Sequence, residues 1–268
     1  MALPIAFFRE SGVGPGVVCL HSNASNSSQW RGLLDTLSPK YRVLAPDSYG
    51  SGKSADWASD RVITLKDEVK FIEPVLAAAG DRFCLVGHSY GAAVALITAL
   101  ANPGRVQAMA LYEPTLFSLI DAQSPSPNAA DGIRQAVHAS SIALDERNPN
   151  DAAKHFIDYW MGSSSWDNTP ESRKLSIAAS VINVRRWWHA LFTEPTPLTA
   201  FRTLSIPVLY MVGKNSPQSS LEVARLLTGV LPHVEVVEFD GLGHMGPITH
   251  PQQVNEVIAS FLASKFHP

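Results

Sequence analysis

One serine and one histidine of this chain stand in glycine-rich turns, where acyl-transfer chemistry needs them. Ser89 lies in Gly87-His-Ser-Tyr-Gly91, between an apolar run at 83–86 and an Ala/Leu-rich stretch at 92–100. A strand, a sharp turn and a helix in this order form a nucleophile elbow, which exposes the serine hydroxyl at the end of the strand. The two glycines lack a Cβ atom, so the turn can tighten against a neighbouring strand. The pattern therefore predicts Ser89 as a nucleophile.

His244 is the predicted general base for this serine. It stands in a Gly-x-Gly-His sequence directly after the last strand pattern, at 234–239. A histidine in such a loop can reach across the sheet edge, take the proton of Ser89 during attack and return it to the leaving group. His250 is the competing histidine, but it precedes Pro251 at the start of a predicted helix, which favours a capping role.

Strand and helix patterns alternate along the chain. Short apolar runs predict strands at 16–20, 41–45, 83–86, 106–111, 207–212 and 234–239. Apolar residues at helical spacing predict helices at 27–37, 65–76, 92–100 and 251–262. Strands that alternate with helices form a mostly parallel sheet with helices on both faces, so we expect an α/β fold.

The strand patterns stop between residues 116 and 202. After a loop rich in Ser, Pro and Asn at 123–128, this stretch reads as helical at 133–144, 152–161 and 173–192. We expect residues 1–115 and 203–268 to form the core, and 116–202 to form an inserted helical cap over its catalytic edge. Four tryptophans of the insertion are expected to pack the cap against the core: Trp160, Trp166, Trp187 and Trp188.

The composition favours a globular protein that acts on a small molecule. The net charge of −3 gives no electrostatic reason to expect nucleic acid. No apolar run is long enough to cross a bilayer, and the start lacks the pattern of a signal peptide, so we expect no membrane partner. Cys19 and Cys84 lie in strand patterns and are predicted to be buried free thiols of a cytoplasmic protein.

One pattern invites a different reading. Gly50-Ser-Gly-Lys-Ser54 resembles a phosphate-binding loop, but the glycine required five residues before Gly52 is replaced by Asp47, and no helix pattern follows. We expect a structural turn there, in which Asp47 binds backbone groups. The histidines lack the carboxylate spacing of a metal site, and neither a metal nor a cofactor is expected.

Over essentially its whole length the chain resembles the α/β-hydrolase fold enzymes. The elbow, the terminal Gly-x-Gly-His and the loop Pro46–Ser54 occur in that family's order, with the nucleophile before the histidine. The resemblance implies an oxyanion hole of two backbone N–H groups. One belongs to Tyr90, and by position the other belongs to Asn23 in the loop His21–Ser25. Ser22 stands where the family usually has the glycine of a His-Gly pair.

The acid of the triad departs from the family pattern. The family usually places an Asp after the next-to-last strand, where this chain has Ser216. Glu113 follows the strand pattern at 106–111, a position where some members of the fold place their acid, and it is predicted to orient His244. Asp240 is the alternative, although it lies close to His244 in the chain.

These residues predict a serine hydrolase of a small ester or related acyl substrate, with a Ser-His-Glu triad and an acyl-enzyme intermediate. Lactone hydrolysis, C–C bond hydrolysis and cofactor-free perhydrolysis remain open on the same triad, because a fold does not choose among them. A non-catalytic protein that binds a small apolar ligand also remains open, since the usual Asp is absent. A homodimer is left open as well.

Overall fold

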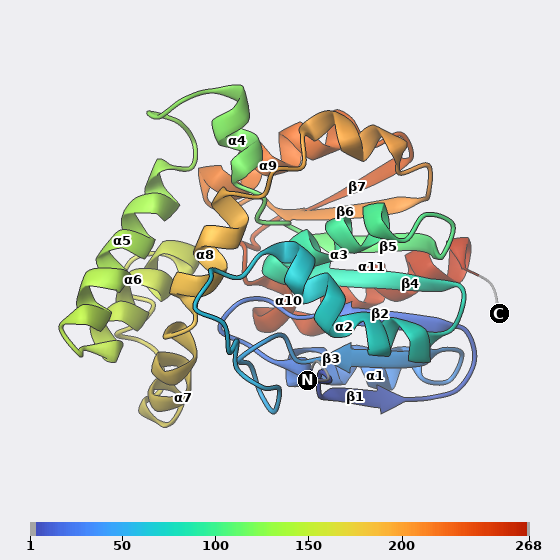
Figure 1. Cartoon of the computed structure of the whole chain (residues 1–268), viewed down its shortest axis with the longest axis horizontal. Coiled ribbons are helices and arrows are strands. Elements are labelled where there is room, and N and C mark those ends of the chain that lie inside the picture. Colours follow the sequence, from blue (N-terminus) through green and yellow to red (C-terminus); the bar gives the residue numbers. More distant parts are fainter. Residues whose placement is uncertain (1–3, 267–268) are drawn as a thin grey trace.

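The apolar runs become the strands of one sheet in the computed structural model, which describes residues 4–266 (Figure 1). The sheet has seven strands in the order β1-β3-β2-β4-β5-β6-β7; β1 pairs antiparallel with β3, and the other pairs are parallel. The strands are β1 (Phe8–Ser11), β2 (Gly16–Leu20), β3 (Arg42–Pro46), β4 (Phe83–His88), β5 (Val106–Tyr112), β6 (Val208–Gly213) and β7 (Val234–Phe239). The predicted α/β fold with a mostly parallel sheet is confirmed.

Helices connect and cover these strands. The α-helices are α1 (Arg31–Leu37), α2 (Leu65–Ala79), α3 (Tyr90–Ala101), α4 (Ser118–Gln123), α5 (Asp131–Asp145), α6 (Pro149–Met161), α7 (Glu171–Val181), α8 (Val184–Phe192), α9 (Gln218–Thr228), α10 (Gly246–Thr249) and α11 (Pro251–Lys265). Segments of 3-10 helix occur at Ser27–Trp30 and Leu198–Thr203. Between residues 4 and 266, no helix is both long and apolar enough to span a membrane.

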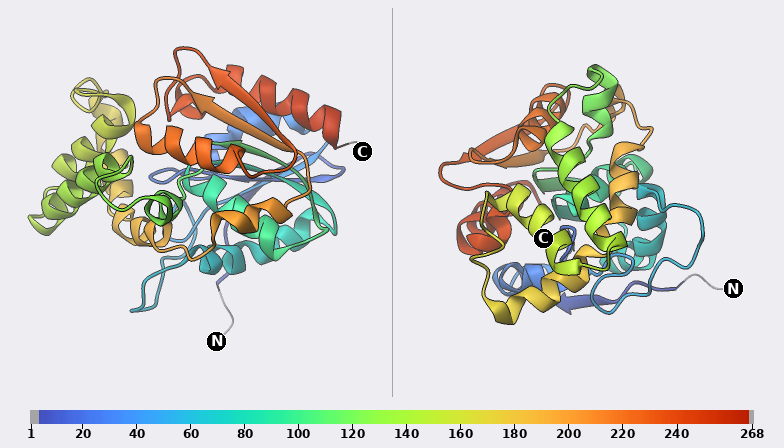
Figure 2. Two further views of the ribbon diagram at one scale, coloured as in Figure 1. Left: turned by 90° about the horizontal axis from the view of Figure 1, so that it is seen from above. Right: turned by 90° about the vertical axis from the view of Figure 1, so that its left-hand side faces the viewer.

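Alternate residues of the strands point into two apolar layers. In β2, Val17 and Cys19 belong to the layer that contains α1 and α11, whereas Val18 and Leu20 belong to the layer of α2 and α3. Figure 2 shows α1 and α11 on one side of the sheet and α2, α3 and α9 on the other. Cys19 and Cys84 are buried free thiols, as predicted, and burial raises the pKa of both.

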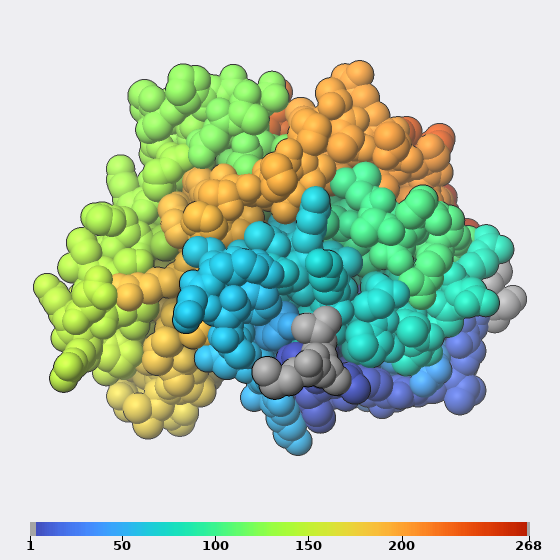
Figure 3. Space-filling model, viewed as in Figure 1, coloured from blue at the N-terminus to red at the C-terminus, as the bar shows by residue number. Residues whose placement is uncertain are grey.

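Helices α4 to α8 gather beyond the carboxyl ends of the parallel strands. They lie at the left of Figure 1, in front of the sheet in the right-hand view of Figure 2, and form the left-hand side of the space-filling view (Figure 3). The predicted helical stretch at 173–192 is helical, but it is divided into two helices, because α7 ends at Val181 and α8 begins at Val184. Between them, the Asn183 side chain donates to the carbonyl oxygen of Gly50 at 2.7 Å, which ties the break to the core.

Asp47 shapes the loop that follows β3. Its Oδ1 accepts a hydrogen bond from the backbone N–H of Ser27 at 2.6 Å, and its Oδ2 accepts one from that of Lys53 at 2.8 Å. Gly52 has a φ of +53°, and a Cβ atom on it would lie 2.1 Å from Oδ2. The predicted structural turn with Asp47 on backbone groups is confirmed.

Glu68 is a carboxyl group buried beside the helix that follows the elbow. The Tyr90 hydroxyl donates to its Oε1 at 3.2 Å, and the backbone N–H of Tyr49 donates to its Oε2 at 3.4 Å. Arg61 precedes α2, the helix that carries Glu68, and pairs with Asp67 instead. Burial without a cation raises the pKa of the Glu68 carboxyl group from its ordinary value of 4.5 to about 7.

This raised pKa makes the stability of the protein depend on pH. The folded state holds the Glu68 proton more tightly than the unfolded state does. The protonated carboxyl group therefore stabilises the fold relative to the ionised one, and this stabilisation is complete below about pH 4.5 and is lost as the pH rises through about 7. We expect Glu68→Gln to gain about 3 kcal/mol of unfolding free energy relative to wild type between pH 5 and pH 8, as measured by urea unfolding. Glu73→Gln, in an exposed position on the same helix, is the control and should show no such gain. Parallel pH profiles for wild type and Glu68→Gln would contradict the prediction.

Candidate active site

Ser89 occupies a sharp turn between β4 and α3. Its φ of 56° and ψ of −117° lie in a region that residues with a side chain rarely adopt. The flanking glycines make the turn feasible. A Cβ atom on Gly91 would lie 2.3 Å from the carbonyl oxygen of Leu20, and one on Gly87 would lie 2.6 Å from the Cα atom of Ala92. The turn therefore has the strand-elbow-helix form that the sequence predicts.

His244 bridges Ser89 and Glu113 from the loop after β7. Its Nε2 lies 2.9 Å from the Ser89 Oγ, and its Nδ1 lies 2.6 Å from the Glu113 Oε2. All three side chains are buried, and Glu113 is 0% exposed. A carboxylate can only accept a hydrogen bond, so Nδ1 carries the proton and Nε2 is left to accept the proton of the serine hydroxyl.

Glu113, directly after β5, is held by groups at and just beyond the end of β6. Its φ is 45°, and its Oε1 accepts hydrogen bonds from the backbone N–H of Gly213 at 2.8 Å and from the Ser216 hydroxyl at 2.6 Å. Ser216, at the usual position of the family's Asp, thus donates to the carboxylate that reaches His244. These donors compensate the buried charge and fix the direction of the side chain.

The two alternative residues lie away from this cluster. Asp240 is 88% exposed at its side chain and pairs with Lys214 at 2.9 Å. His250 is exposed, and its Nδ1 lies 2.9 Å from the Thr249 hydroxyl. His250 occupies the N-cap position of α11, but its side chain makes no capping hydrogen bond, so the predicted capping role is wrong.

A second hydrogen-bonded chain, which sequence reasoning missed, supports the loop of His244. Because the carbonyl oxygen of His244 accepts a bond from His88 Nε2 at 2.8 Å, that nitrogen carries the proton. The side-chain amide of Gln29 then donates to His88 Nδ1 at 3.1 Å, and its oxygen accepts from the backbone N–H of Ser22 at 3.1 Å. Burial lowers the pKa of His88 well below its ordinary value and keeps the ring neutral.

Trp160 covers the imidazole of His244 from α6. The two rings are stacked, with centroids 3.8 Å apart and an interplanar angle of 24°. The predicted packing role is confirmed for all four tryptophans, because Trp160, Trp166 and Trp187 are buried and Trp188 packs half-buried against the same core. Trp160 also forms a wall of the site. An indole over an imidazole excludes water from it and stabilises the ring when it becomes positively charged.

The two predicted oxyanion-hole residues flank Ser89. Tyr90 is the first residue of α3, and the N–H groups of a helix's first turn have no acceptor within the helix. Asn23 lies in the loop after β2 and lines the same cavities as Ser89. Its side-chain Oδ1 is buried without a hydrogen-bond partner among residues 4–266.

A large cavity opens beside Ser89 and His244. Its volume is about 810 Å³, and its wall combines the loops after β2 and β7 with α6 and α7. Apolar side chains such as Trp160 and Ile177 alternate in it with polar ones, and Arg173 lies on its wall. Within the described residues, no group of three or more His, Cys, Asp or Glu side chains is arranged to hold a metal ion.

The sequence pattern of the alpha/beta hydrolase family matches residues 17–257. The chain belongs to the alpha/beta hydrolase family. The match runs from β2 into α11 and so includes the elbow, the strand that carries Glu113 and the loop of His244. The prediction of an α/β-hydrolase enzyme is thereby confirmed.

Relatives of similar length include esterases and lipases. A pimeloyl-[acyl-carrier protein] methyl ester esterase of Legionella pneumophila is 23% identical over 245 residues, which are 89% of this chain and 91% of that one. Lipase LipV of Mycobacterium tuberculosis is 26% identical over 267 residues, or 94% and 95% of the two chains. Among solved structures, an esterase of Rhodococcus has a TM-score of 0.76 at 22% identity and covers 98% of each chain, which shows the shared fold.

Gly91 and Gly32 offer a matched test of the elbow of this hydrolase, because each is the second residue of a helix. A Cβ atom at residue 91 would collide with the backbone of Leu20, whereas one at residue 32 would lie 3.3 Å from the Asn255 side chain. We expect Gly91→Ala to lower the unfolding free energy by at least about 2 kcal/mol. We expect Gly32→Ala to be neutral or to stabilise by up to about 1 kcal/mol. Equal stability of the two variants in urea unfolding would refute the close approach.

Proposed function

We propose that this chain hydrolyses carboxylic esters with Ser89 as nucleophile, His244 as general base and Glu113 as the acid of the triad. The observation that carries the proposal is the continuous hydrogen-bonded chain from the Ser89 Oγ through the two ring nitrogens of His244 to the Glu113 Oε2, with contacts of 2.9 and 2.6 Å. The esterases and the lipase among its relatives support ester hydrolysis as the reaction.

In the acylation step, the Ser89 Oγ attacks the ester carbonyl carbon while His244 Nε2 takes its proton. The carbonyl oxygen becomes an oxyanion and accepts hydrogen bonds from the backbone N–H groups of Tyr90 and Asn23. Donors placed for this charge are worth about 3 kcal/mol each in acyl transfer. His244 then gives the proton to the departing alkoxide, and the acyl group remains on Ser89.

Deacylation repeats these steps with water in place of the serine. Water enters through the large cavity, which His244 lines, and His244 Nε2 takes a proton from it as it attacks the acyl carbon. The carboxylic acid leaves with the hydroxyl group of the water, and His244 returns the proton to the Ser89 Oγ. The active site then returns to its starting protonation state.

Glu113 acts through His244 during both steps. Its carboxylate keeps the proton on Nδ1 and stabilises the imidazolium that forms when Nε2 is protonated. Gly213 and Ser216 donate to the Glu113 Oε1, the oxygen that does not contact His244, and Trp160 covers the imidazole of His244. The carboxylate that the family usually supplies after β6 is thus supplied here after β5.

This arrangement favours catalysis over the alternative of a non-catalytic ligand-binding protein. That alternative rested on the absence of the usual Asp, and Glu113 provides a carboxylate at hydrogen-bond distance from His244. Lactone hydrolysis is the same acyl transfer on a cyclic ester and belongs to the proposed reaction class. Neither C–C bond hydrolysis nor perhydrolysis is favoured by a particular contact among the described residues.

Hydrolysis of p-nitrophenyl acetate and butyrate tests the proposal. We expect Ser89-dependent turnover by the wild type, no turnover above background by Ser89→Ala, and a loss of at least about 10²-fold in kcat for Glu113→Gln. The amide side chain keeps the size of the carboxylate but not its charge, and it can present an N–H group toward Nδ1.

Asp240→Asn is the matched control, since it removes an exposed carboxylate at the alternative position. It should keep the wild-type kcat within about twofold. If Asp240→Asn lost activity and Glu113→Gln did not, the assignment of the acid would be wrong. A wild type without Ser89-dependent turnover on these esters would remove the proposed reaction.

A further inference from the structure

Two cavities meet at Ser89, and they differ in size and in the groups that line them. The large one, of about 810 Å³, is lined by Ser89 and by His244. The small one, of about 20 Å³, is lined by Ser89 but not by His244. Apart from Asn23, Ser89 and Thr115, its lining is aromatic and aliphatic: Phe117, Ile133, Val137, Phe156, Trp160, Val184, Trp188 and Leu191.

The chemistry of the triad decides which part of an ester enters each cavity. The leaving alkoxide takes its proton from His244 Nε2, so its oxygen must lie on the side of that nitrogen. The large cavity is on that side, and it also admits the water that later attacks from the same direction. The acyl substituent points away from His244, and the small cavity is therefore its site.

The small cavity limits how long the acyl group can be. A volume of about 20 Å³ is little more than the space in which one water molecule can move. It holds the methyl group of an acetyl ester and, with small adjustments of the walls, about two further carbons. The alcohol portion, in contrast, has the large cavity.

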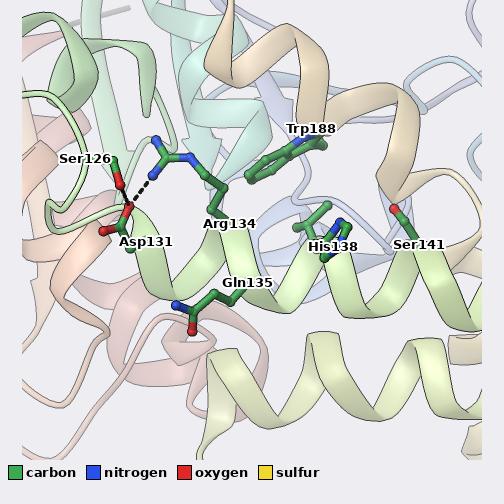
Figure 4. A pocket seen from close by; sticks show the side chains of 8 residues that line it. Ser126, Asp131, Arg134, Gln135, His138, Ser141 and Trp188 are labelled. Carbon is green, nitrogen blue, oxygen red and sulfur yellow. Dashed lines mark hydrogen bonds and ion pairs between the residues drawn. The ribbon is translucent and has the colours of Figure 1, made fainter.

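Trp188 and Val137 are part of the wall of the small cavity. Both also line a hollow of about 520 Å³ on the outer side of α5 and α8. Figure 4 shows Trp188 reaching from α8 toward Arg134 on α5 at the edge of this hollow. These two side chains thus separate the acyl site from a second space that reaches solvent.

The wall is held in place by its neighbours. The Trp188 ring packs on Phe192, with centroids 3.8 Å apart. The Arg134 guanidinium lies over the Phe192 ring, 4.9 Å from its centroid, and forms ion pairs with Asp121 and Asp131. The charge of the guanidinium is therefore already compensated, which makes the hollow unsuited to an anionic ligand. The main feature of the hollow is then the wall of Trp188 and Val137 that separates it from the small cavity.

We propose that Trp188, with Val137, sets the acyl specificity of this hydrolase: it prefers esters of short acyl groups, of about two to four carbons, with larger alcohols. The proposal rests on the function proposed above. Shortening either wall residue joins the acyl site to the outer hollow and opens a path for longer acyl chains.

The test is a series of p-nitrophenyl esters from acetate to octanoate. For the wild type, kcat/KM should fall at least about tenfold between butyrate and octanoate. For Trp188→Ala, the ratio of kcat/KM for octanoate to that for acetate should rise at least about tenfold, because each methylene moved from water to apolar surroundings is worth about fourfold. Val137→Ala, a smaller change in the same wall, should move the ratio in the same direction.

His138→Ala is the matched control. His138 is exposed and lines the outer hollow but not the small cavity, so this variant should keep the wild-type profile. A second series varies the alcohol, with acetates from ethanol to octanol followed by pH-stat. In the wild type, kcat/KM should stay level or rise along this series, because the alcohol lies in the large cavity.

The outcomes separate the two proposals. Wild-type activity that depends on Ser89 and is equal on acetate and octanoate would overturn the acyl limit while leaving the hydrolase assignment intact. A fall along the alcohol series rather than the acyl series would show that the two cavities have the opposite roles. An unchanged profile in both Trp188→Ala and Val137→Ala, with wild-type melting temperatures, would show that these residues are not the limit. No Ser89-dependent turnover on any ester would remove the proposed function itself.

Discussion

The hydrogen bond between Glu113 and His244 is the interaction on which the arrangement of the site depends. It joins the end of β5 to the loop after β7 at 2.6 Å and leaves Nε2 free to meet Ser89. Gly213, the last residue of β6, and Ser216, in the turn that follows, hold the carboxylate from the other side. Three adjacent parallel strands thus meet through one buried carboxylate, and a charge in that position is tolerated because every contact to it is a donor.

Much of the fold could be predicted because its elements have regular apolar patterns. The buried strands of a parallel sheet are short apolar runs, and the surrounding helices have one apolar face. The missed edge strand β1 lacks these signals, because it has the polar sequence Phe-Arg-Glu-Ser and is half-buried. Helix α9 was missed although Val223, Ala224, Leu226 and Leu227 form a buried apolar face on it. The break between α7 and α8 depends on Asn183 and Gly50, which are far apart in the chain.

The site was predictable where local geometry decides it. The elbow of Ser89 and the loop of His244 are each contained in a few residues, and the candidate acid followed from its place after β5. The contacts around them were hidden because they join distant segments. Gln29 reaches His88 across 59 positions, and Trp160 comes from a helix whose register on the core no sequence pattern specifies. A polar side chain in a loop could have many partners, and only tertiary structure selects one.

The proposed catalysis depends most on the activation of Ser89 through His244 by Glu113. Covalent labelling by diethyl p-nitrophenyl phosphate tests this without knowledge of the natural substrate. In that reaction the Ser89 Oγ attacks phosphorus, p-nitrophenolate leaves, and the serine proton passes to His244. We expect one label per chain, located on Ser89 by peptide mass spectrometry, and labelling at least about 10²-fold slower in Glu113→Gln. A label on another residue, or equal rates in the two proteins, would contradict the proposed activation of Ser89.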